Sequence, residues 1–289
     1  LTTPRPPWAG LSSDRPLVMG ILNVTPDSFS DGGRFLDPAA AIEAGRRMLA
    51  QGADILDIGA ESTRPGAPPL DPAEEQARLL PVVRALAAHG LLSVDTRNAA
   101  TMAAALEAGA RIVNDVSALA HDPRAPATVA RAGCPVVLMH MRGTPATMRA
   151  HATYADVAAE VFRELAARIA TAEAAGIARE NIVADPGIGF AKTPAQNLVL
   201  LDRLAGFHGL GVRLLVGVSR KSFIGRYGGA AHAADRLPGS LAATLFALSR
   251  GAHILRVHDV AETVQAVRVW QACANPGGAG DFAAPTAQA

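Results

Sequence analysis

Short apolar runs rich in Val, Ile and Leu alternate along the chain with longer segments rich in Ala, Glu and Arg that have a helical period. This alternation predicts repeated βα units, whose strands run parallel and are buried on both faces. We count eight units, and eight parallel units close naturally into a barrel. The sequence therefore predicts an α/β fold of the (β/α)8, or TIM-barrel, class, with strands at residues 17–22, 55–58, 91–94, 111–113, 136–139, 182–184, 214–218 and 254–257.

The segments between these strands carry signals for the starts and ends of helices. Proline follows aspartate at 37–38, 71–72 and 122–123, where Pro suits a first helical turn and Asp suits the N-cap position. Several segments end at a glycine, which readily adopts the left-handed conformation found after helices. The predicted helices cover residues 38–51, 72–88, 97–108, 123–132, 154–175, 194–205, 238–250 and 260–272.

The domain organisation follows from length and periodicity. A chain of 289 residues fits one barrel with short ends, because such barrels typically take about 250 residues. No G-x-G-x-x-G motif follows the first predicted strand, which disfavours an open dinucleotide-binding sheet. We expect an irregular N-terminal segment at 1–16, a single barrel domain at 17–272 and a disordered tail at 273–289, with both ends peripheral.

Composition restricts the kind of core, the binding partners and the cellular location that we expect for the protein. Apolar residues make up 49% of the sequence and aromatic residues 4%, so the core must consist mainly of Ala, Val, Leu and Ile. A formal charge of +1 gives no broad attraction for nucleic acid or an anionic membrane. The two cysteines lack metal-ligand or disulfide spacing, and no apolar run resembles a membrane span or a signal peptide. We therefore expect a cytoplasmic protein that binds neither nucleic acid nor membrane.

Polar residues follow most of the predicted strands, at the end of the barrel where active sites lie. Asp95, Asn114 and Asp185 stand just beyond three of these strands. Buried polar groups cost free energy unless they find partners, and a flat heterocycle with amide-like groups would supply those partners. A single Asp at such a place more often caps a helix or pairs with an arginine, so the sequence leaves that alternative open.

Cationic residues come from the last two predicted strands and the segments that follow them. Lys221, Arg256 and His258 lie where barrel enzymes often bind phosphate, although each alone could equally be a structural or surface residue. Asn23 ends the first strand and could offer its side-chain oxygen to Mg2+. One neutral ligand predicts that the metal arrives with a phosphate-bearing substrate; the alternative for Asn23 is a turn residue before Pro26.

The first two connections after strands are longer than the usual length of about 2–6 residues, and long connections are commonly lids or binding loops. They carry Phe29, Thr63 and Arg64. Arg64 on a closing loop could recognise a carboxylate. Phe190 offers an aromatic wall beyond the sixth strand, and a position in the core is equally compatible with it.

Five strings of residues, each on a different strand, together resemble the dihydropteroate synthases. The strings are residues 23–33, 61–66, 185–193, 217–225 and 256–259, and the resemblance runs in order from about residue 17 to 272. It implies a (β/α)8 barrel that joins 6-hydroxymethyl-7,8-dihydropterin pyrophosphate to p-aminobenzoate. The products would be 7,8-dihydropteroate and pyrophosphate, formed through dissociative cleavage of the C–O bond in folate biosynthesis.

The resemblance also implies roles for individual residues. Catalysis would rest on Asp95, Lys221 and Arg256, with Asp95 stabilising the cation that forms. Mg2+ would be bound through Asn23. The residues implied for each ligand are, for the pterin, Asp95, Asn114, Met139, Asp185, Phe190, Lys221 and Arg256; for pyrophosphate, Asn23, Arg256 and His258; and for p-aminobenzoate, Phe29, Thr63, Arg64, Pro65, Phe190 and Ser222.

Further expectations and alternatives follow from the same resemblance. It implies that p-aminobenzoate binds after pyrophosphate has organised the loops, that sulfonamides compete with it, and that the chain forms a homodimer, for which the Ala-rich helix at 238–250 is a candidate interface. One alternative is a catalytically silent pterin-binding paralogue, which need not keep the loop strings present here. Another is a related barrel that transfers a methyl group from a reduced folate to a corrinoid partner, which would not need the string at 219–223.

Overall fold

The structure, a computed structural model, describes residues 7–12, 14–25, 38–62, 66–67, 69–274 and 276. The predicted p-aminobenzoate residues Phe29, Thr63, Arg64 and Pro65 lie outside the described residues, as does almost all of the predicted tail. The other predicted site residues are all described.

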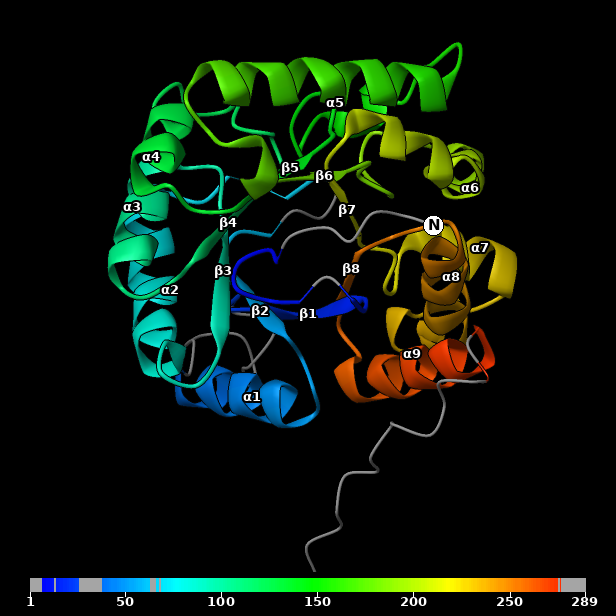
Figure 1. Cartoon of the computed structure of the whole chain (residues 1–289), viewed down its shortest axis with the longest axis horizontal. Helices are drawn as coiled ribbons and strands as arrows, with labels where there is room; N and C mark the ends of the chain where they lie inside the picture. The colour runs from blue at the N-terminus through cyan, green and yellow to red at the C-terminus, as the bar shows by residue number, and fades with distance from the viewer. Residues whose placement is uncertain are drawn as a thin grey trace, which may run out of the picture.

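Eight parallel strands pair in chain order, and the first pairs with the last, so the sheet closes into a barrel (Figure 1). The predicted (β/α)8 fold is confirmed. Several strands end later than predicted because a final polar residue, such as Asn23, Asp95 or Asp185, still belongs to the ladder. The strands are β1 (Leu17–Asn23), β2 (Ile55–Gly59), β3 (Leu91–Asp95), β4 (Ile112–Asp115), β5 (Val136–Met139), β6 (Ile182–Asp185), β7 (Arg213–Val216) and β8 (Ile254–Val257).

Side chains along each strand alternate between two environments, because successive strand residues point to opposite faces. One set, which includes Val18, Leu56 and Val94, belongs to the main core between strands and helices. The other set points into the barrel. Its lower layer is an apolar cluster that contains Leu17, Met19, Ile55, Ile112, Val137, Val183, Leu215 and Ile254. The next inward positions on the same strands therefore lie above an apolar floor.

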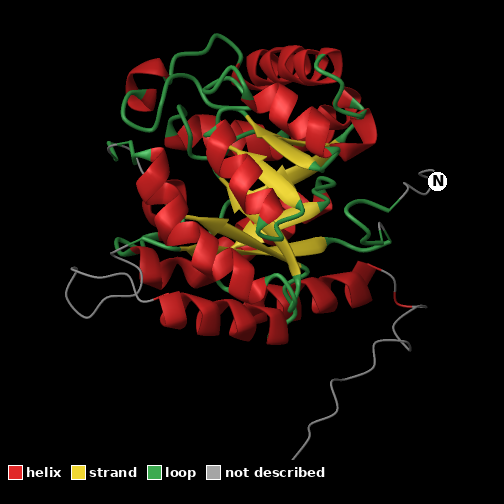
Figure 2. Cartoon of the chain, turned by 90° about the vertical axis from the view of Figure 1, so that its left-hand side faces the viewer, coloured by secondary structure: helices red, strands yellow, loops and turns green. Residues whose placement is uncertain are grey.

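Helices surround the strands on all sides (Figures 1 and 2). The short helix α7 was not predicted, because its seven residues include two glycines and show no clear period. The helices are α1 (Pro38–Ala50), α2 (Pro72–Leu86), α3 (Ala99–Glu107), α4 (Ala125–Ala132), α5 (Val157–Ala174), α6 (Pro194–Asp202), α7 (Ser222–Gly228), α8 (Leu237–Ser249) and α9 (Val260–Ala274), with short 3-10 helices at Met148–His151, Arg179–Asn181, Leu204–Leu210 and Ala233–Arg236.

Side-chain caps explain where several helices begin. Asp71 accepts hydrogen bonds from the backbone of the first turn of α2, as predicted from its Asp-Pro pair. Thr193 and Gln196 form a reciprocal capping box at α6. The predicted start of a helix at 123 is wrong, because α4 begins at Ala125. The carboxylate of Asp122 instead accepts from Ala99 N, at the start of α3, at 3.0 Å.

The described part of the N-terminal segment, residues 7–12 and 14–16, contains no helix or strand, but it is not peripheral throughout. Trp8 is 2% exposed and belongs to the apolar cluster inside the barrel. It forms an isolated antiparallel bridge with Leu11, and its Nε1 donates to Asn181 O at 3.3 Å, just before β6. The expectation that this whole segment is peripheral is therefore wrong at Trp8. The barrel has no large aromatic residue of its own at this end, and the segment supplies one.

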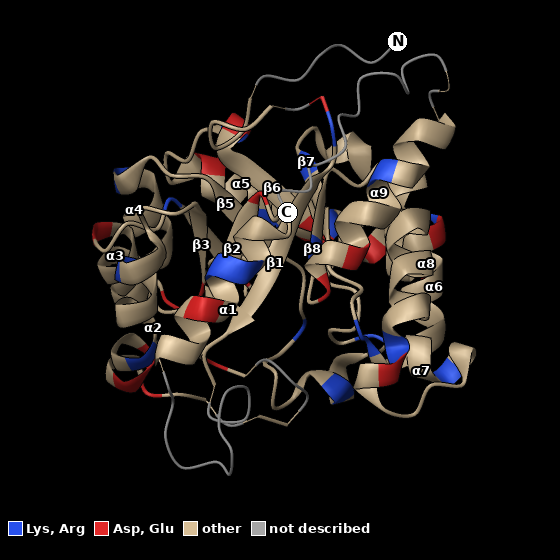
Figure 3. Cartoon of the chain, turned by 90° about the horizontal axis from the view of Figure 1, so that it is seen from below, with Lys and Arg blue, Asp and Glu red and all other residues tan. Residues whose placement is uncertain are grey.

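Charged residues are spread over the outer helices. In the view of Figure 3, acidic and basic positions are interspersed on the helices, which agrees with the net charge of +1. Within the part of the chain that the structure describes, no helix is both long enough and apolar enough to cross a membrane.

Candidate active site

The C-terminal ends of the strands, here called the rim, carry a row of polar residues at one level of the barrel. Strand register places Asn23 beside Gly59, Gly59 beside Asp95, and Asp95 beside Asn114. A side chain at Gly59 would crowd this row, since a Cβ there would lie 3.2 Å from the Cβ of Asp95. The structure thus brings together three predicted residues, from β1, β3 and β4.

Arg256 on β8 ties the rim together from across the barrel. Its Nε donates to Asp57 Oδ2 at 2.6 Å, and its Nη2 donates to Asp95 Oδ2 at 2.7 Å. The side-chain amide of Asn114 donates to the same oxygen of Asp57 at 2.8 Å. Charge-assisted hydrogen bonds of this kind fix geometry strongly. One guanidinium therefore holds two carboxylates from neighbouring strands.

Sequence reasoning missed Asp57, which is fully buried in the middle of β2. The prediction considered polar residues near or beyond the ends of strands, whereas Asp57 lies at the centre of one. A signal was present, because a carboxylate inside an otherwise apolar strand needs a partner. Its Oδ1 has no hydrogen-bond partner among the described residues. Asp57 therefore adds a buried negative charge beneath the predicted site.

Burial controls the charges of this cluster. It raises the pKa of Asp95, and the neighbouring Arg256 offsets this only in part. Burial also acts against the charge of Arg256, but Asp57 and Asp95 outweigh that effect and raise the pKa of the guanidinium, which stays charged. Without further positive charge nearby, burial thus disfavours the ionised form of Asp95. An incoming positive charge would relieve this.

Asp185 ends β6 and faces the same space. It is 6% exposed, and its Oδ1 accepts from Gly187 N at 2.7 Å. Burial raises the pKa of Asp185 to about 6, while the Gly187 bond, Lys221 and Arg256 act in the opposite direction. The predicted pterin residue is therefore a buried acceptor with one oxygen already held by its own loop.

An aromatic and methionine wall borders the polar cluster. Phe190 and Met139 are buried and pack together with Val116. Lys221 Nζ lies 4.1 Å from the centroid of the Phe190 ring, a cation–π contact. Burial lowers the pKa of Lys221 to about 8, although Asp185 and Asp95 favour its charge. The structure thus places three predicted residues, Met139, Phe190 and Lys221, side by side.

A strained turn before α7 positions Lys221. Arg220 has φ +59°, a left-handed conformation that is uncommon without glycine. Its backbone N–H donates to Ser240 Oγ at 2.9 Å, and its carbonyl accepts from Arg236 at 3.0 Å. Its guanidinium pairs with Asp259, next to the end of β8. Three contacts therefore hold a conformation that costs of order 1–3 kcal/mol, as is common at functional sites.

His258 follows β8 and is fixed by Ser219. Ser219 Oγ accepts from His258 N at 3.2 Å and lies 3.0 Å from His258 Nδ1. The hydroxyl can donate to Nδ1, and a neutral ring in that arrangement carries its proton on Nε2. Burial lowers the pKa of His258 to about 3, with further help from nearby Arg256, so the ring is neutral in the ligand-free site.

Two other predicted site residues, Ser222 and Asn23, are more exposed to solvent. Ser222 is exposed at the first position of α7, and Asn23 is half-buried at the end of β1. Among the described residues, no group of three His, Cys, Asp or Glu side chains could hold a metal ion. A metal at Asn23 would therefore need oxygens from a substrate and from water, which suits a hard cation such as Mg2+.

The connection after β2 is anchored at both ends by contacts that the sequence did not predict. Glu61 and Arg97 form a buried ion pair, with oxygen–nitrogen distances of 2.7 and 2.9 Å. Glu61 also accepts from Leu70 N at 3.1 Å. Further along, Gly66 N donates to Pro145 O at 3.0 Å, in the connection after β5. These contacts hold the stems of the connection against the rim.

The rim combines three kinds of group. Asp95, Asn114 and Asp185 present hydrogen-bonding groups, Phe190 and Met139 present a flat apolar wall, and Arg256, Lys221 and His258 can receive an anion. This set suits a flat polar heterocycle that carries a phosphate group.

Comparisons with known proteins agree with this chemistry. A family model described as pterin binding enzyme matches residues 19–258, from β1 to just beyond β8. The dihydropteroate synthase of Escherichia coli K12 is 48% identical over 264 residues, which cover 91% of this chain and 93% of that protein. The chain belongs to the dihydropteroate synthase family. The resemblance inferred from the five strings is thereby confirmed.

Solved members of the dihydropteroate synthase family share the whole barrel. The Xanthomonas albilineans enzyme with 4-aminobenzoic acid is 50% identical, with a TM-score of 0.88 over 94% of this chain and 99% of that one. The same enzyme in complex with 7,8-dihydropteroate is 47% identical, with a TM-score of 0.83 over 91% and 95%. A Yersinia pestis member with a sulfonamide drug is 44% identical, with a TM-score of 0.87 over 92% and 96%.

The substitution Asp185→Asn should stabilise the ligand-free protein at neutral pH. The folded-state pKa of about 6 lies above the unfolded value of 3.8, so the ionised carboxyl destabilises the fold at high pH. The penalty begins to fall as the pH drops through 6 and is lost near the unfolded pKa. Asn keeps an oxygen for Gly187 but carries no charge. We expect a gain of about 2 kcal/mol in the free energy of unfolding at about pH 8, and almost none at about pH 4.

Urea unfolding at the two pH values measures this difference. The exposed carboxyl of Asp235 provides the control, since Asp235→Asn should change stability little at either pH. An equal gain from Asp185→Asn at both pH values would show that charge burial is not its cause.

Proposed function

We propose that the chain performs the dihydropteroate synthase reaction with 6-hydroxymethyl-7,8-dihydropterin pyrophosphate and p-aminobenzoate as substrates. The observation that carries the proposal is the Arg256 cluster, in which one guanidinium holds two buried carboxylates at the rim. Such a cluster has charge to offer both to a cation and to an anion. The family relationship extends over the whole barrel, so these groups lie in the context of an enzyme rather than of an isolated motif.

The pterin would bind in the polar layer of the rim. Asp185 and Asn114 are buried groups that can pair with the amide and amine edges of a pterin ring. Phe190 and Met139 border the ring on one side. The full set of proposed pterin residues is Asp95, Asn114, Met139, Asp185, Phe190, Lys221 and Arg256.

The pyrophosphate group would lie towards β8 and β1. Arg256 is charged, and the neutral ring of His258 has an Nε2–H that can donate to a phosphate oxygen. Asn23 would contribute one oxygen to a Mg2+ ion whose other ligands come from pyrophosphate and water. When bound, Mg2+ would offset part of the charge on the leaving group.

The chemistry begins with cleavage of the bond between the pterin methylene carbon and the pyrophosphate oxygen. The electron pair leaves with pyrophosphate, and a cationic methylene remains. The amine nitrogen of p-aminobenzoate then forms the new C–N bond and loses a proton, which pyrophosphate can accept. Asp95 would stabilise the cation, because burial disfavours the ionised form of this carboxyl and positive charge that develops nearby favours it.

The second substrate would bind where the first two connections close over the rim. The proposed p-aminobenzoate residues are Phe29, Thr63, Arg64, Pro65, Phe190 and Ser222, of which Phe190 and Ser222 are described. The anchored stems at Glu61 and Gly66 support the idea that the second connection stays near the rim. Sulfonamides, which resemble p-aminobenzoate, would compete at this place.

Release of pyrophosphate on mixing the protein with dihydropterin pyrophosphate, Mg2+ and p-aminobenzoate tests the function. We expect release coupled one-to-one to dihydropteroate, loss of p-aminobenzoate binding when pyrophosphate or Mg2+ is withheld, and competition by a sulfonamide. Saturable pterin binding without turnover would instead identify a silent pterin-binding paralogue. Methyl transfer from a reduced folate to a corrinoid protein, without pyrophosphate release, would identify the other alternative.

The substitution Asp95→Asn tests the role of that carboxylate. We expect kcat to fall by about a hundredfold, while the Kd for the pterin substrate changes by less than about tenfold, because the charge acts mainly on the transition state. Asp115→Asn is the control: it removes a fully buried carboxyl from β4, whose side-chain oxygens accept from Ser117 and Leu119. Equal losses of kcat and of pterin affinity in Asp95→Asn would contradict this role.

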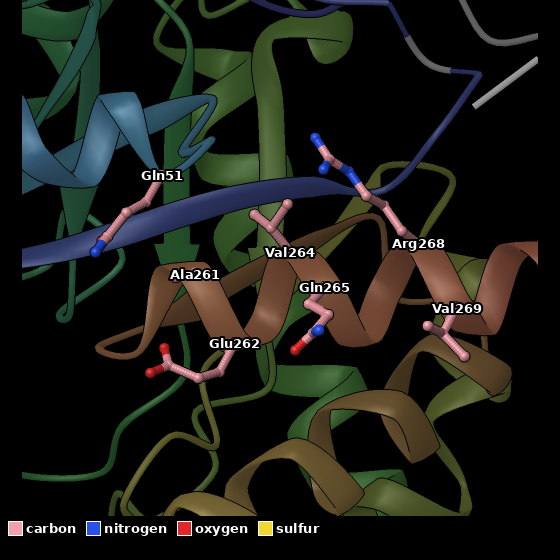
Figure 4. Close-up of a pocket in the computed structure, with 7 residues that line it drawn as sticks. All are labelled: Gln51, Ala261, Glu262, Val264, Gln265, Arg268 and Val269. Atoms are coloured by element: carbon pink, nitrogen blue, oxygen red, sulfur yellow. The ribbon is translucent and has the colours of Figure 1, made fainter. Parts of the chain in front are cut away.

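The chain would act as a homodimer through the side of the barrel formed by α6 to α9. Every exposed large hydrophobic residue among those described lies on these helices: Leu198, Val199, Tyr227, Phe246 and Val269. A hollow of about 450 Å³ runs along α9 beside Gln51 (Figure 4). An adjoining hollow of about 470 Å³ lies between α9 and α8. Neither is lined by a rim residue, so a partner here would leave the site open.

Sedimentation velocity tests the homodimer. We expect the wild type to sediment at twice the chain mass of 29.7 kDa, and Phe246→Glu, on α8, to sediment as a monomer. Ala170→Glu adds the same charge to an exposed position of α5 and should leave the dimer intact. A wild type that stays monomeric at high concentration would refute the interface.

A further inference from the structure

Lysine is almost absent from this chain, and both lysines that it has belong to the rim. The sequence contains 27 Lys and Arg residues in total, of which only Lys192 and Lys221 are lysines. Elsewhere an arginine supplies each basic charge, including every basic side chain on the outer helices. Lys221 is part of the proposed pterin site. Lys192 is buried, at 9% exposure, and has no role in the mechanism described above.

The ammonium group of Lys192 lies beneath the β6–α6 loop, residues 186–193, and is surrounded by acceptors. Its Nζ lies 2.8 Å from Phe190 O, 3.0 Å from Gly187 O and 3.5 Å from His140 O. It also lies 3.0 Å from His140 Nδ1. Two of the acceptors belong to the loop itself, and the other two belong to the residue that follows β5. Lys192 therefore fastens the loop to the end of the neighbouring strand.

A series of hydrogen bonds connects Lys192, through His140, to the partly exposed Glu164. Lys192 donates to His140 Nδ1, so the neutral His140 ring carries its proton on Nε2, which lies 2.9 Å from Glu164 Oε2. Burial lowers the pKa of His140 to about 4, which keeps the ring neutral. Arg142 Nε in turn donates to Glu164 at 3.1 Å. Each acceptor in the chain is thus oriented by a further partner.

The loop backbone approaches its neighbours closely at two glycines. Gly187 has φ +68°, and a Cβ there would lie 2.0 Å from His140 O and 3.3 Å from Lys192 Nζ. Gly189 has φ +85°, and a Cβ there would lie 3.0 Å from Cδ of Lys221. The loop backbone is therefore packed between the two lysines, with Lys192 underneath and Lys221 on the side of the site.

We infer that Lys192 is a positioning residue, which holds the β6–α6 loop so that Asp185 and Phe190 keep the geometry needed to bind the pterin. The inference rests on the proposed function only for the identity of that ligand. The hydrogen-bond partners of Lys192 Nζ among the described residues are loop carbonyls and His140. Lys192 acts through the carbonyls of Gly187 and Phe190, and Gly187 N in turn holds the Asp185 carboxylate.

The geometry explains why this position keeps a lysine where the chain otherwise uses arginine. Three donors on one tetrahedral nitrogen can serve acceptors that converge from different directions, whereas a planar guanidinium suits acceptors in one plane. Burial lowers the pKa of Lys192 to about 7. A neutral amine still keeps two N–H donors, so the loop carbonyls retain their partner in either state.

The scarcity of lysine gives a direct readout. Protein labelled with 13C and 15N on lysine should show only two side-chain spin systems, and the Lys221 signals should be shifted by the ring current of Phe190, which lies under its ammonium group. In Lys192→Met we expect this shift to be lost, because Phe190 moves, and the Kd for 6-hydroxymethylpterin to rise by about tenfold or more. A fold that is merely less stable would leave the Lys221 shift in place.

Two further variants sharpen the comparison. His140→Phe keeps a ring of similar size but removes the Nδ1 acceptor, and should give a smaller loss of pterin affinity, about two- to fivefold, with a partial change in the Lys221 shift. Arg179→Met is the matched control, since Arg179 holds a backbone carbonyl, Leu210 O, at the opposite end of β6. It should lower stability but leave both readouts unchanged.

An unchanged Lys221 shift and pterin affinity in folded Lys192→Met would overturn the inference. If that variant does not fold, two other results decide. An unchanged Lys221 shift and pterin affinity in His140→Phe would overturn the inference. So would Lys192 Nζ protons in the wild type that exchange with water as fast as those of a free lysine. The lysine signals need no turnover. Failure of the wild type to release pyrophosphate would therefore refute the proposed function without touching this test.

Discussion

The ion pairs that Arg256 makes with Asp57 and Asp95 are the interaction on which the rim depends. These residues lie on β8, β2 and β3, so their contacts reach across the inside of the closed barrel. Removing one partner from such a buried network typically costs about 3–5 kcal/mol, because the remaining charge stays buried. The same cost makes the network rigid. Asn114 joins through the oxygen that Asp57 already shares with Arg256, so a single guanidinium sets the positions of three neighbouring side chains.

The interior of the barrel has two layers, because inward-facing side chains recur every two residues along each strand. The lower inward positions are apolar and close around Trp8, while the upper inward positions carry carboxylates, amides and cations. Burying the polar half costs stability, which shows in the raised pKa values of Asp95 and Asp185 and in the lowered value of Lys221. The apolar floor and the core between strands and helices offset that cost. Substitutions at the two ends should therefore affect different properties, stability at the floor and ligand binding at the rim.

Much of this arrangement could be predicted from the sequence, because it follows from short-range rules. Strands, helices and the order of βα units are readable from period and from residues such as Asp71 that cap helices. Once the barrel is assumed, any polar residue at a strand end must lie at the rim, which is why Asp95, Asn114, Asp185 and Arg256 were found. The family relationship then confirmed the ligand class, while the individual roles stay predictions.

The residues that escaped prediction depend on contacts that the sequence does not display. Asp57 lies within a strand rather than after it, and its partner Arg256 stands at the other end of the chain. Trp8 looks like part of an irregular end, yet it fills the barrel floor. Lys192 lies in a string that was recognised, but its side chain turns back beneath the loop rather than towards the site. In each case the deciding fact is a direction in space, which local periodicity does not encode.

The position of Trp8 has a consequence for the order in which the molecule can form. Trp8 contacts the carbonyl of Asn181, 173 residues further along the chain. In addition, β1 pairs with β8, so one edge of β1 stays unpaired until β8 has formed. Contacts of such large sequence separation slow folding, since a long stretch of chain must be ordered before they form. During synthesis β1 must wait for β8, and until then the apolar edge of β1 stays open to other chains. Chaperone demand for this protein should therefore be highest just before its final strand is complete.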